Sequence, residues 1–272
     1  MNAGSLCLLA ALAWGTGCVA YNEPCQPLVD GPTTSVATLE TGTEIWLDRA
    51  NARHASNAFG QAVADAYFDA FLSGQSGGVQ FGVVNGGALR SEGLCGKTRT
   101  ILKGAITRGD VYEVLLFQNR VYAVTLKTSE VFALFENSVA KLAKAGDPIV
   151  SPSGQFLQVS SQVAVEIDCN LAPGSRVTSL RIGLQGLQRT GEQKDFRVAL
   201  PDFILGGGDG YDFMKPLGND LSRNPAQATK GGGIDAEIAR AYFESKFKTT
   251  PLTRDDNRIK LTGCATPARP TN

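Results

Sequence analysis

The stretch Val79-Gln80-Phe81-Gly82-Val83-Val84-Asn85-Gly86-Gly87-Ala88-Leu89-Arg90 holds the most structural information in this chain. Its first half, residues 79–84, is a short apolar run that predicts a buried strand. A pair of glycines follows, which lets the backbone approach a ligand closely. Arg90 then supplies a planar guanidinium that can bind a phosphate or a carboxylate through two hydrogen bonds. A tight turn followed by a surface arginine is the simpler interpretation of this stretch when it is taken alone.

Helices and strands follow one another around this stretch without a regular alternation. Apolar residues recur at three-to-four spacing behind Ser56, which predicts an amphipathic helix ending near Gly74. A strand over 121–126 precedes a helix that Thr128 could cap, and a last helix is expected from Asp235. Further strands are expected at 156–159, 163–167, 177–182 and 196–200. We therefore expect an α/β (α+β) fold, a single domain with a mixed β-sheet and flanking helices.

The first twenty residues have the pattern of a secretory signal, with a short apolar core at 6–14 and small residues at 15–20. Cleavage before Cys18, with a lipid on Cys18 that would anchor the chain to a membrane, and cleavage after Ala20 both fit. A buried N-terminal helix is the alternative. We expect a linker at 21–40, the folded domain at 41–262 and a tail at 263–272. The chain is then exported, as a periplasmic protein or an outer-membrane or cell-surface lipoprotein.

Four cysteines remain after such processing: Cys25, Cys95, Cys169 and Cys264. This even number suits two disulfides in an oxidising compartment, and the sequence leaves all three pairings open. The 26 Lys and Arg residues balance the 26 Asp and Glu residues without a basic run. Duplex nucleic acid is therefore not an expected partner.

The chain contains a single histidine, His54. A dinuclear phosphoesterase centre needs several His and Asp side chains that converge on two metal ions. We therefore expect no catalytic residue, no metal ligand and no cofactor site in this chain. His54 precedes the first long helix, where a solvated or helix-capping role is expected.

A second glycine-rich stretch, residues 200–211, places Asp209 in a loop six residues after Phe203. The Asp209 carboxylate can accept hydrogen bonds from two sugar hydroxyls, and the Phe203 ring can stack on a base. Phe156, which follows Gly154-Gln155, is another stacking candidate. An Asp-Gly turn and two core phenylalanines are the simpler interpretations of these residues taken singly.

Taken together and in order, these stretches resemble the C-terminal, substrate-binding domain of the 5'-nucleotidase family, nucleotide hydrolases of the periplasm and cell surface. The likeness covers residues 41–262. It rests on Arg53-His54-Ala55-Ser56-Asn57, Ala64-Asp65-Ala66, Asn85-Gly86-Gly87 with Arg90, Leu116-Phe117-Gln118-Asn119, Gly154-Gln155-Phe156-Leu157-Gln158-Val159-Ser160, and Phe203 with Gly206-Gly207-Gly208-Asp209-Gly210-Tyr211. The sequence departs from the family's pattern at three places. Ala88-Leu89 stands where Gly-Ile is commoner, and Gln118 and Ser161 each stand where Gly is commoner.

The resemblance implies a substrate-binding site. Arg90 and Asn119 would hold the phosphate or ribose side, and Lys127 would be a second cation there. The base would lie between Phe156 and Phe203. The glycine-rich loop would contribute the remaining contacts, with Asp209 binding the ribose hydroxyls and Gly207 and Gly208 beside it.

Members of the family also carry an N-terminal metallophosphoesterase domain with the two-metal centre, and here we expect a signal and a tether in its place. We therefore expect the chain to recognise a nucleoside monophosphate or a nucleoside. It would take part in nucleotide catabolism only together with a separate metallophosphoesterase chain, which would supply any divalent metal. The alternative is an exported nucleotide- or nucleoside-binding lipoprotein, or a scaffold, with no hydrolytic role. Whether the chain is an enzyme is left open by the sequence.

Overall fold

The computed structural model describes residues 29–72, 78–90, 101–149, 154–219, 233–253 and 256–268. The expected signal with Cys18, and the cysteines Cys25 and Cys95, lie outside these residues. Within the part of the chain that is described, no helix is long and apolar enough to cross a membrane. The expected mixed α/β architecture is confirmed.

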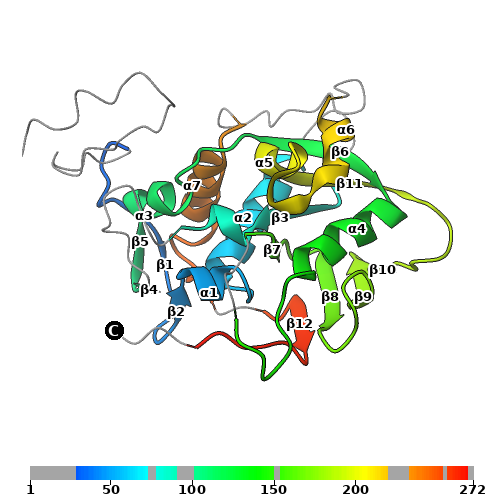
Figure 1. Ribbon diagram of the computed structural model, residues 1–272. Helices are drawn as coiled ribbons and strands as arrows, with labels where there is room; N and C mark the ends of the chain where they lie inside the picture. The colour runs from blue at the N-terminus through cyan, green and yellow to red at the C-terminus, as the bar shows by residue number, and fades with distance from the viewer. Residues whose placement is uncertain are drawn as a thin grey trace, which may run out of the picture.

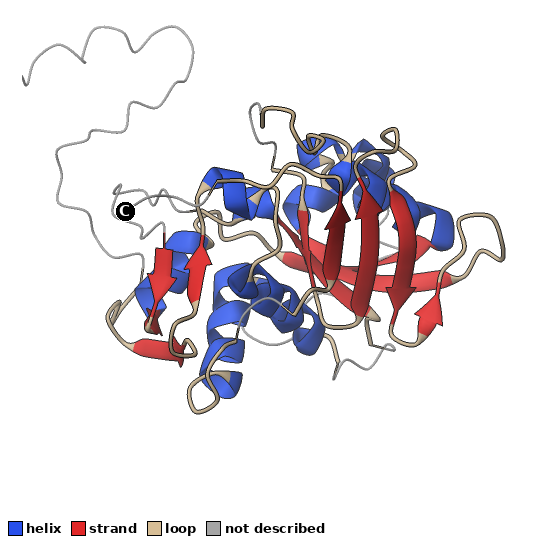
Figure 2. Ribbon diagram, turned by 90° about the horizontal axis from the view of Figure 1, so that it is seen from below, coloured by secondary structure: helices blue, strands red, loops and turns tan. Residues whose placement is uncertain are grey.

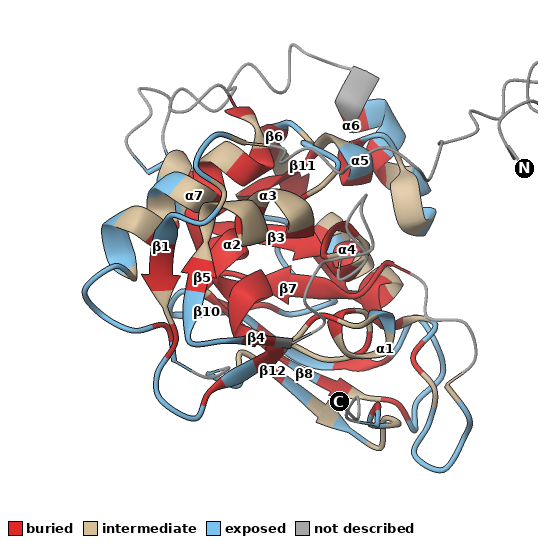
Figure 3. Cartoon of the chain, turned by 90° about the vertical axis from the view of Figure 1, so that its left-hand side faces the viewer, coloured by how far each residue is buried: buried red, intermediate tan, exposed pale blue. Residues whose placement is uncertain are grey.

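A four-stranded central sheet forms the middle of the molecule (Figure 1). Its order is β6 (Val121–Lys127), β11 (Asp195–Pro201), β3 (Phe81–Asn85) and β7 (Leu157–Val159). Strands β11 and β3 are parallel, whereas β6 and β7 run antiparallel to their neighbours. Every residue of β3 and β7 is buried, as Figure 3 shows, which explains the continuous apolar run of residues 79–84.

A second four-stranded sheet has the order β10 (Gln185–Gly186), β9 (Val177–Ile182), β8 (Val163–Asp168) and β12 (Ile259–Thr262). Strand β12 is parallel to β8, and the other pairs are antiparallel. Buried and exposed residues alternate along β8, since one face of this sheet packs on the core and the other meets water.

Two short strand pairs stand apart from the larger sheets in Figure 2. They are β1 (Ser35–Thr38) with β5 (Ala105–Thr107), and β2 (Glu44–Trp46) with β4 (Ile101–Lys103). Strand β1 lies within the residues expected to form a linker. Hydrogen-bonded strand residues therefore begin at Ser35, before the expected boundary at residue 41.

Helix α2 (Ala58–Ala70) packs on β3 and also contacts α7 (Asp235–Lys246). Their contact includes an edge-on pair of rings, Phe59 and Phe243, with centroids 5.2 Å apart. Helix α2 begins one residue later than expected, because Asn57 rather than Ser56 is the N-cap and accepts a hydrogen bond from Gly60 N at 2.8 Å. A Cβ at Gly82 would lie 2.4 Å from Ala64 O, so glycine is what lets α2 lie this close to β3.

The remaining helices are shorter, except for α4. Helix α4 (Thr128–Val139) contacts β6, β11 and β9. Helices α1 (Arg49–Ala52) and α3 (Arg108–Val114) flank the strand pairs, and α5 (Asp202–Leu205) and α6 (Lys215–Asn219) follow β11.

His54, expected to be solvated or to cap a helix, is buried instead. Its Nδ1 lies 3.0 Å from Ala50 O, one turn earlier. Burial lowers the pKa of the imidazole, so the neutral form is favoured. Burial thus excludes the solvated alternative, whereas the contact with Ala50 O places the ring at a carbonyl of α1, a helix too short to leave a periodic pattern in the sequence.

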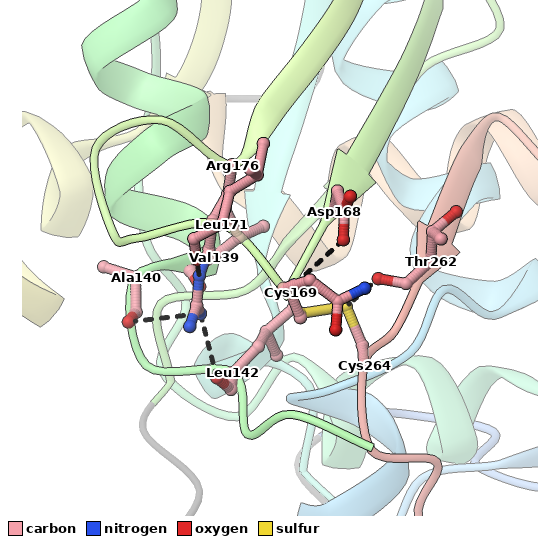
Figure 4. Close-up of a disulfide and its surroundings, with 10 residues drawn as sticks. Val139, Ala140, Leu142, Asp168, Cys169, Leu171, Arg176, Thr262 and Cys264 are labelled. Atoms are coloured by element: carbon pink, nitrogen blue, oxygen red, sulfur yellow. Dashed lines mark hydrogen bonds between the residues drawn. A yellow bond between two sulfur atoms is a disulfide. The ribbon is translucent and has the colours of Figure 1, made fainter.

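A disulfide joins Cys169, after β8, to Cys264, after β12 (Figure 4). Cys264 lies beyond residue 262, so the disulfide links the first residues of the expected tail to the end of β8. Close by, the buried guanidinium of Arg176 donates hydrogen bonds to carbonyls at the end of α4: Nη1 lies 2.7 Å from Val139 O and 2.8 Å from Leu142 O. These contacts satisfy carbonyls that the helix itself leaves without a partner.

Candidate functional site

The strand directions bring the glycine-rich stretches together at one edge of the central sheet. Strands β3 and β11 are parallel, so Asn85 at the end of β3 and the loop after Pro201 leave the sheet on the same side. Strands β6 and β7 are antiparallel to them, so their first residues reach that side too. We call this side, with residues 85–90, 117–120, 154–156 and 203–211, the site edge.

Asp209 is the centre of the hydrogen bonds at the site edge. Asn85 Nδ2 donates to Asp209 Oδ2 at 2.8 Å, and Asn137 Nδ2 donates to the Asp209 carbonyl at 3.2 Å. The φ of Asp209 is 53°, a left-handed conformation that costs a non-glycine residue about 1 kcal/mol or more. These two hydrogen bonds hold Asp209 in its strained conformation. Neither of them uses Asp209 Oδ1, which among the described residues can accept a further hydrogen bond.

Two glycines make room for this carboxylate. A Cβ at Gly154 would lie 2.5 Å from Asp209 Oδ2, and a Cβ at Gly87 would lie 3.0 Å from the same atom. Backbone hydrogen bonds tie these segments, with Gly87 N donating to Gly154 O at 2.8 Å and Gly86 N donating to Phe156 O at 2.6 Å. The glycines are therefore required by the close approach of three chain segments.

The loop that carries Asp209 also carries an exposed aromatic ring. Phe203 is 45% exposed and packs over Gly208, where a Cβ would lie 2.4 Å from the ring. Gly207 has a φ of 84°, and the Lys215 side chain crosses it. The structure thus brings Phe203, Gly207, Gly208 and Asp209 together, and one face of this cluster is an aromatic surface.

The other expected stacking residue, Phe156, is placed differently. Its ring is only 1% exposed and belongs to the hydrophobic core. Next to it, Tyr211 OH donates to Gln155 O at 2.6 Å, and burial raises the pKa of this phenol. Phe203 offers an open ring face in this structure and Phe156 does not, so stacking on both sides of a base stays a prediction that requires Phe156 to be uncovered.

Arg90 and the 115–119 loop form a second part of the site edge. Arg90 Cζ lies 4.8 Å from the centroid of Phe117, a ring that is 51% exposed, and Arg90 N donates to Val114 O at 3.0 Å. Gln118 has a φ of 50°. This left-handed conformation explains why glycine is the commoner residue there.

Asn119 is held by a buried carboxyl group. Asn119 Nδ2 donates to Asp235 Oδ2 at 3.1 Å, and Asp235 N donates to Asn119 O at 2.9 Å. Burial is the main cause that raises the pKa of Asp235 from 3.8 to about 7, and hydrogen bonds from Ala236 and Asn119 oppose that shift. Sequence reasoning did not select Asp235, because a carboxylate in the first turn of a helix normally stabilises the helix dipole and needs no further role.

Lys127 lies away from the site edge. It pairs with Asp195, with Nζ 2.6 Å from Oδ1, and both side chains are more than half exposed. In the β6–β11 register, Lys127 faces Asp195 while Val121 faces Pro201. Six strand residues span about 20 Å, so Lys127 lies at the opposite end of β6 and is not brought together with the other expected residues.

The donor set of the chain does not fit a dinuclear metal centre. The sequence has one histidine, and it is buried against Ala50. Among the residues that the structure describes, no group of three or more His, Cys, Asp or Glu side chains could hold a metal ion. We therefore assign no metal-dependent step to these residues.

Asn85, Asn137 and Asp235 are functional candidates that sequence reasoning did not select. Asn85 lies in the Asn-Gly-Gly motif itself, so its position directly before two glycines was a usable signal. Asn137 lies inside helix α4 and reaches Asp209 only because α4 packs beside the site edge. No local pattern marks that residue.

Comparison with known proteins places these features in context. A family model described as 5'-nucleotidase, C-terminal domain, matches residues 35–216. A snake venom 5'-nucleotidase from Macrovipera lebetinus is 29% identical over 174 residues, which are 62% of this chain and 38% of that protein. An apyrase from Aedes albopictus is 26% identical over 222 residues, which are 78% of this chain and 34% of that protein.

Solved structures give the same result for the fold. A 5'-nucleotidase precursor from Thermus thermophilus matches with a TM-score of 0.65 at 25% identity, covering 84% of this chain and 39% of that chain. An NAD nucleotidase from Haemophilus influenzae matches with a TM-score of 0.60 at 19% identity, covering 87% and 39%. The present chain thus spans well under half the length of each of these proteins.

Proposed function

This chain belongs to the family of 5'-nucleotidase C-terminal domains, and on that premise we propose that it binds a nucleoside or a nucleoside monophosphate at the site edge. The arrangement of Asp209 carries the proposal. Its Oδ2 is engaged by Asn85 while Oδ1 can accept from a ribose hydroxyl, and the open ring of Phe203 lies in the same loop. A carboxylate beside an aromatic face suits a sugar joined to a base.

The guanidinium of Arg90 supports binding of a phosphate on the neighbouring part of the site edge. It lies over Phe117 and can present its remaining N–H groups to phosphate oxygens. Asn119, fixed by Asp235, adds a polar group in the adjoining loop. We keep Lys127 outside this proposal, because its exposed ion pair with Asp195 lies at the other end of β6.

We further propose that the chain serves nucleotide catabolism together with a separate metallophosphoesterase chain. Hydrolysis of this kind uses two metal ions that clamp the phosphate and generate the nucleophile. The described residues lack the ligands for them, so a second polypeptide would supply both the ions and the catalytic groups. Mixing such a chain with this one should produce phosphate release from AMP that depends on Phe203 and Asp209.

An exported binding protein with no hydrolytic role is the second candidate. The Thr16-Gly17-Cys18 segment favours it, since a lipid on Cys18 would hold a sensor or scavenger at a membrane. The Cys169–Cys264 disulfide supports export in either case, because disulfides persist in oxidising compartments. Rapid AMP hydrolysis by the two-chain mixture would argue against this candidate.

Titration calorimetry of adenosine and AMP against the full chain tests the binding proposal. We expect affinities in the high-micromolar to millimolar range, because one stacked ring contributes about 1–3 kcal/mol. Phe203→Ala should therefore weaken binding of both ligands at least about five-fold. Leu184→Ala is the matched control, since Leu184 is a fully exposed apolar residue in the β9–β10 turn. Equal binding by the wild type and Phe203→Ala would refute the proposal.

A further inference from the structure

Asp235, the first residue of α7, has no exposed surface and makes three short hydrogen bonds. Its backbone N–H donates to Asn119 O at 2.9 Å, and its Oδ2 accepts from Asn119 Nδ2 at 3.1 Å. Its Oδ1 accepts from Ala236 N at 2.7 Å. The main chain and the side chain of Asn119 are therefore both fastened to one buried residue.

The residues next to Asn119 and Asp235 are also connected to the loop that carries Phe203. Arg120 forms an isolated antiparallel bridge with Ile234, directly before Asp235. Arg120 O also accepts from Asp202 N at 2.8 Å, and Asp202 is followed by Phe203. The start of α7 thus holds the 115–119 loop and the start of α5 in a fixed relation.

We propose that Asp235 is a positioning residue of the nucleotide site, which sets whether Asn119 presents its amide oxygen or its amino group to the ligand. The inference rests on the proposed function, because it assigns a polarity to one contact of that site. It also adds to the site a residue, Asp235, that positions a neighbour and does not itself touch the ligand.

Protonation of the two carboxyl oxygens of Asp235 would have different energetic costs. Oδ1 faces a backbone N–H, which cannot turn away, so a proton there would break that hydrogen bond. Oδ2 faces the amide of Asn119, which can turn end for end and offer its oxygen instead. When Asp235 is ionised, Asn119 Nδ2 faces the carboxylate and Asn119 Oδ1 faces away from Asp235. When Asp235 is protonated, Asn119 Oδ1 faces the carboxyl group and Asn119 Nδ2 faces away from Asp235.

Both forms are populated near neutral pH. Burial is the main cause that raises the pKa of Asp235 to about 7, and the carboxylate of Asp202 on α5 raises it further. Within the described part of the chain, Tyr67 on α2 is a further titratable side chain close to this group, and burial, then Asp235 and Asp202, keep the pKa of its phenol well above the ordinary value. Tyr67 therefore stays neutral while Asp235 titrates.

The experiment is a titration of adenosine against the full chain between about pH 5 and 9, a range in which adenosine has no titrating group. The wild-type affinity should change about five-fold with a midpoint near neutral pH, which is the effect of one hydrogen bond gained or lost. Asp235→Asn mimics the protonated acid, so its affinity should equal the acidic limit of the wild type at every pH. Asp202→Asn should keep the five-fold change and move its midpoint to lower pH.

A purely structural role for Asp235 would predict weaker binding by Asp235→Asn with no change in the pH profile. The same pH profile in the wild type and in Asp235→Asn would therefore overturn the proposal. Circular dichroism of each variant at both ends of the pH range shows whether it is folded.

A second measurement separates this inference from the proposed function. The side-chain amide signals of Asn119 in a ¹⁵N-labelled, ligand-free sample should shift with the same midpoint, and this shift should vanish in Asp235→Asn. If the wild type binds no adenosine, the proposed function fails, and the Asn119 signals still decide the coupling. Asn119 signals that do not shift with pH in the wild type would overturn the proposed coupling between Asp235 and Asn119.

Discussion

Asp235→Asn should stabilise the protein at alkaline pH and leave its stability almost unchanged at acidic pH. In the folded state the pKa of Asp235 is about 7, against 3.8 for the ordinary group. Below about pH 4 the carboxyl is neutral in both the folded and the unfolded chain. As the pH rises to about 7, only the unfolded chain gains from ionisation, so the stability contributed by the neutral acid is lost.

The size of this effect follows from the difference of about three pKa units. At about 1.4 kcal/mol per unit, the folded state loses roughly 4 kcal/mol between pH 4 and 8. The asparagine avoids this loss and can keep both hydrogen bonds if Asn119 turns over. Thermal unfolding followed by circular dichroism should give a melting temperature for Asp235→Asn roughly 10 °C above that of the wild type at pH 8, and nearly equal at pH 4.

Asp195→Asn is the matched control for this experiment. Its carboxylate is more than half exposed and pairs with the exposed Lys127, so the substitution should change stability little at either pH. An Asp235→Asn protein that is no more stable than the wild type at pH 8 would refute the reasoning. It would mean that the hydrogen bonds of the carboxylate offset the cost of its burial.

Four further predictions concern the stability of the fold and the close packing around the Asp209 carboxylate. Replacing Cys169 and Cys264 by serine should cost about 4 kcal/mol in denaturant unfolding, because the bridge closes a loop with a sequence separation of 95; a loss below about 1 kcal/mol would contradict this. Arg176→Met should cost about 3–5 kcal/mol in the same assay, since it removes the donors to the end of α4, while Arg176→Lys should retain part of the stability. Gln118→Gly should raise the free energy of unfolding by about 1 kcal/mol by relieving its left-handed backbone, and a decrease would count against strain at this position. Gly154→Ala should weaken adenosine binding at least tenfold by displacing the Asp209 carboxylate, and calorimetry that finds unchanged affinity would disprove the close fit.

The elements that could be predicted from the sequence are those with a clear period or a buried run. Residues 177–182 were expected as a strand and form β9, and the helix expected from Asp235 is α7. The strands β1, β2, β4 and β5 were missed because each has only three or four residues and, unlike the three-residue β7, none is buried along its whole length in the central sheet. Such pieces are stabilised by their partners rather than by local preference, so a single-sequence pattern does not reveal them.

The candidate site could be selected from the sequence only where the motif itself holds the residue. Asp209 and Phe203 share one loop, so their proximity follows from their spacing. Phe156 and Lys127 depended on knowing which way their strands run. Phe156 precedes β7 at the site edge, but its ring turns into the core, whereas Lys127 ends β6 at the far side of the sheet. Strand direction and side-chain orientation are tertiary properties that composition and spacing do not contain.

The backbone of Asp209 bears on the choice between a binding site and a scaffold. A left-handed aspartate is costly, and a loop free of functional constraint would lower its free energy with glycine or with a relaxed conformation. Here two asparagines from different elements, Asn85 and Asn137, instead hold the strained residue in place, and two glycines make room for its carboxylate. Such a loop keeps Asp209 oriented before any ligand arrives, which lowers the entropy cost of binding. That arrangement favours a working site over a scaffold. The strained backbone belongs to the residue whose carboxylate the proposed ligand would contact.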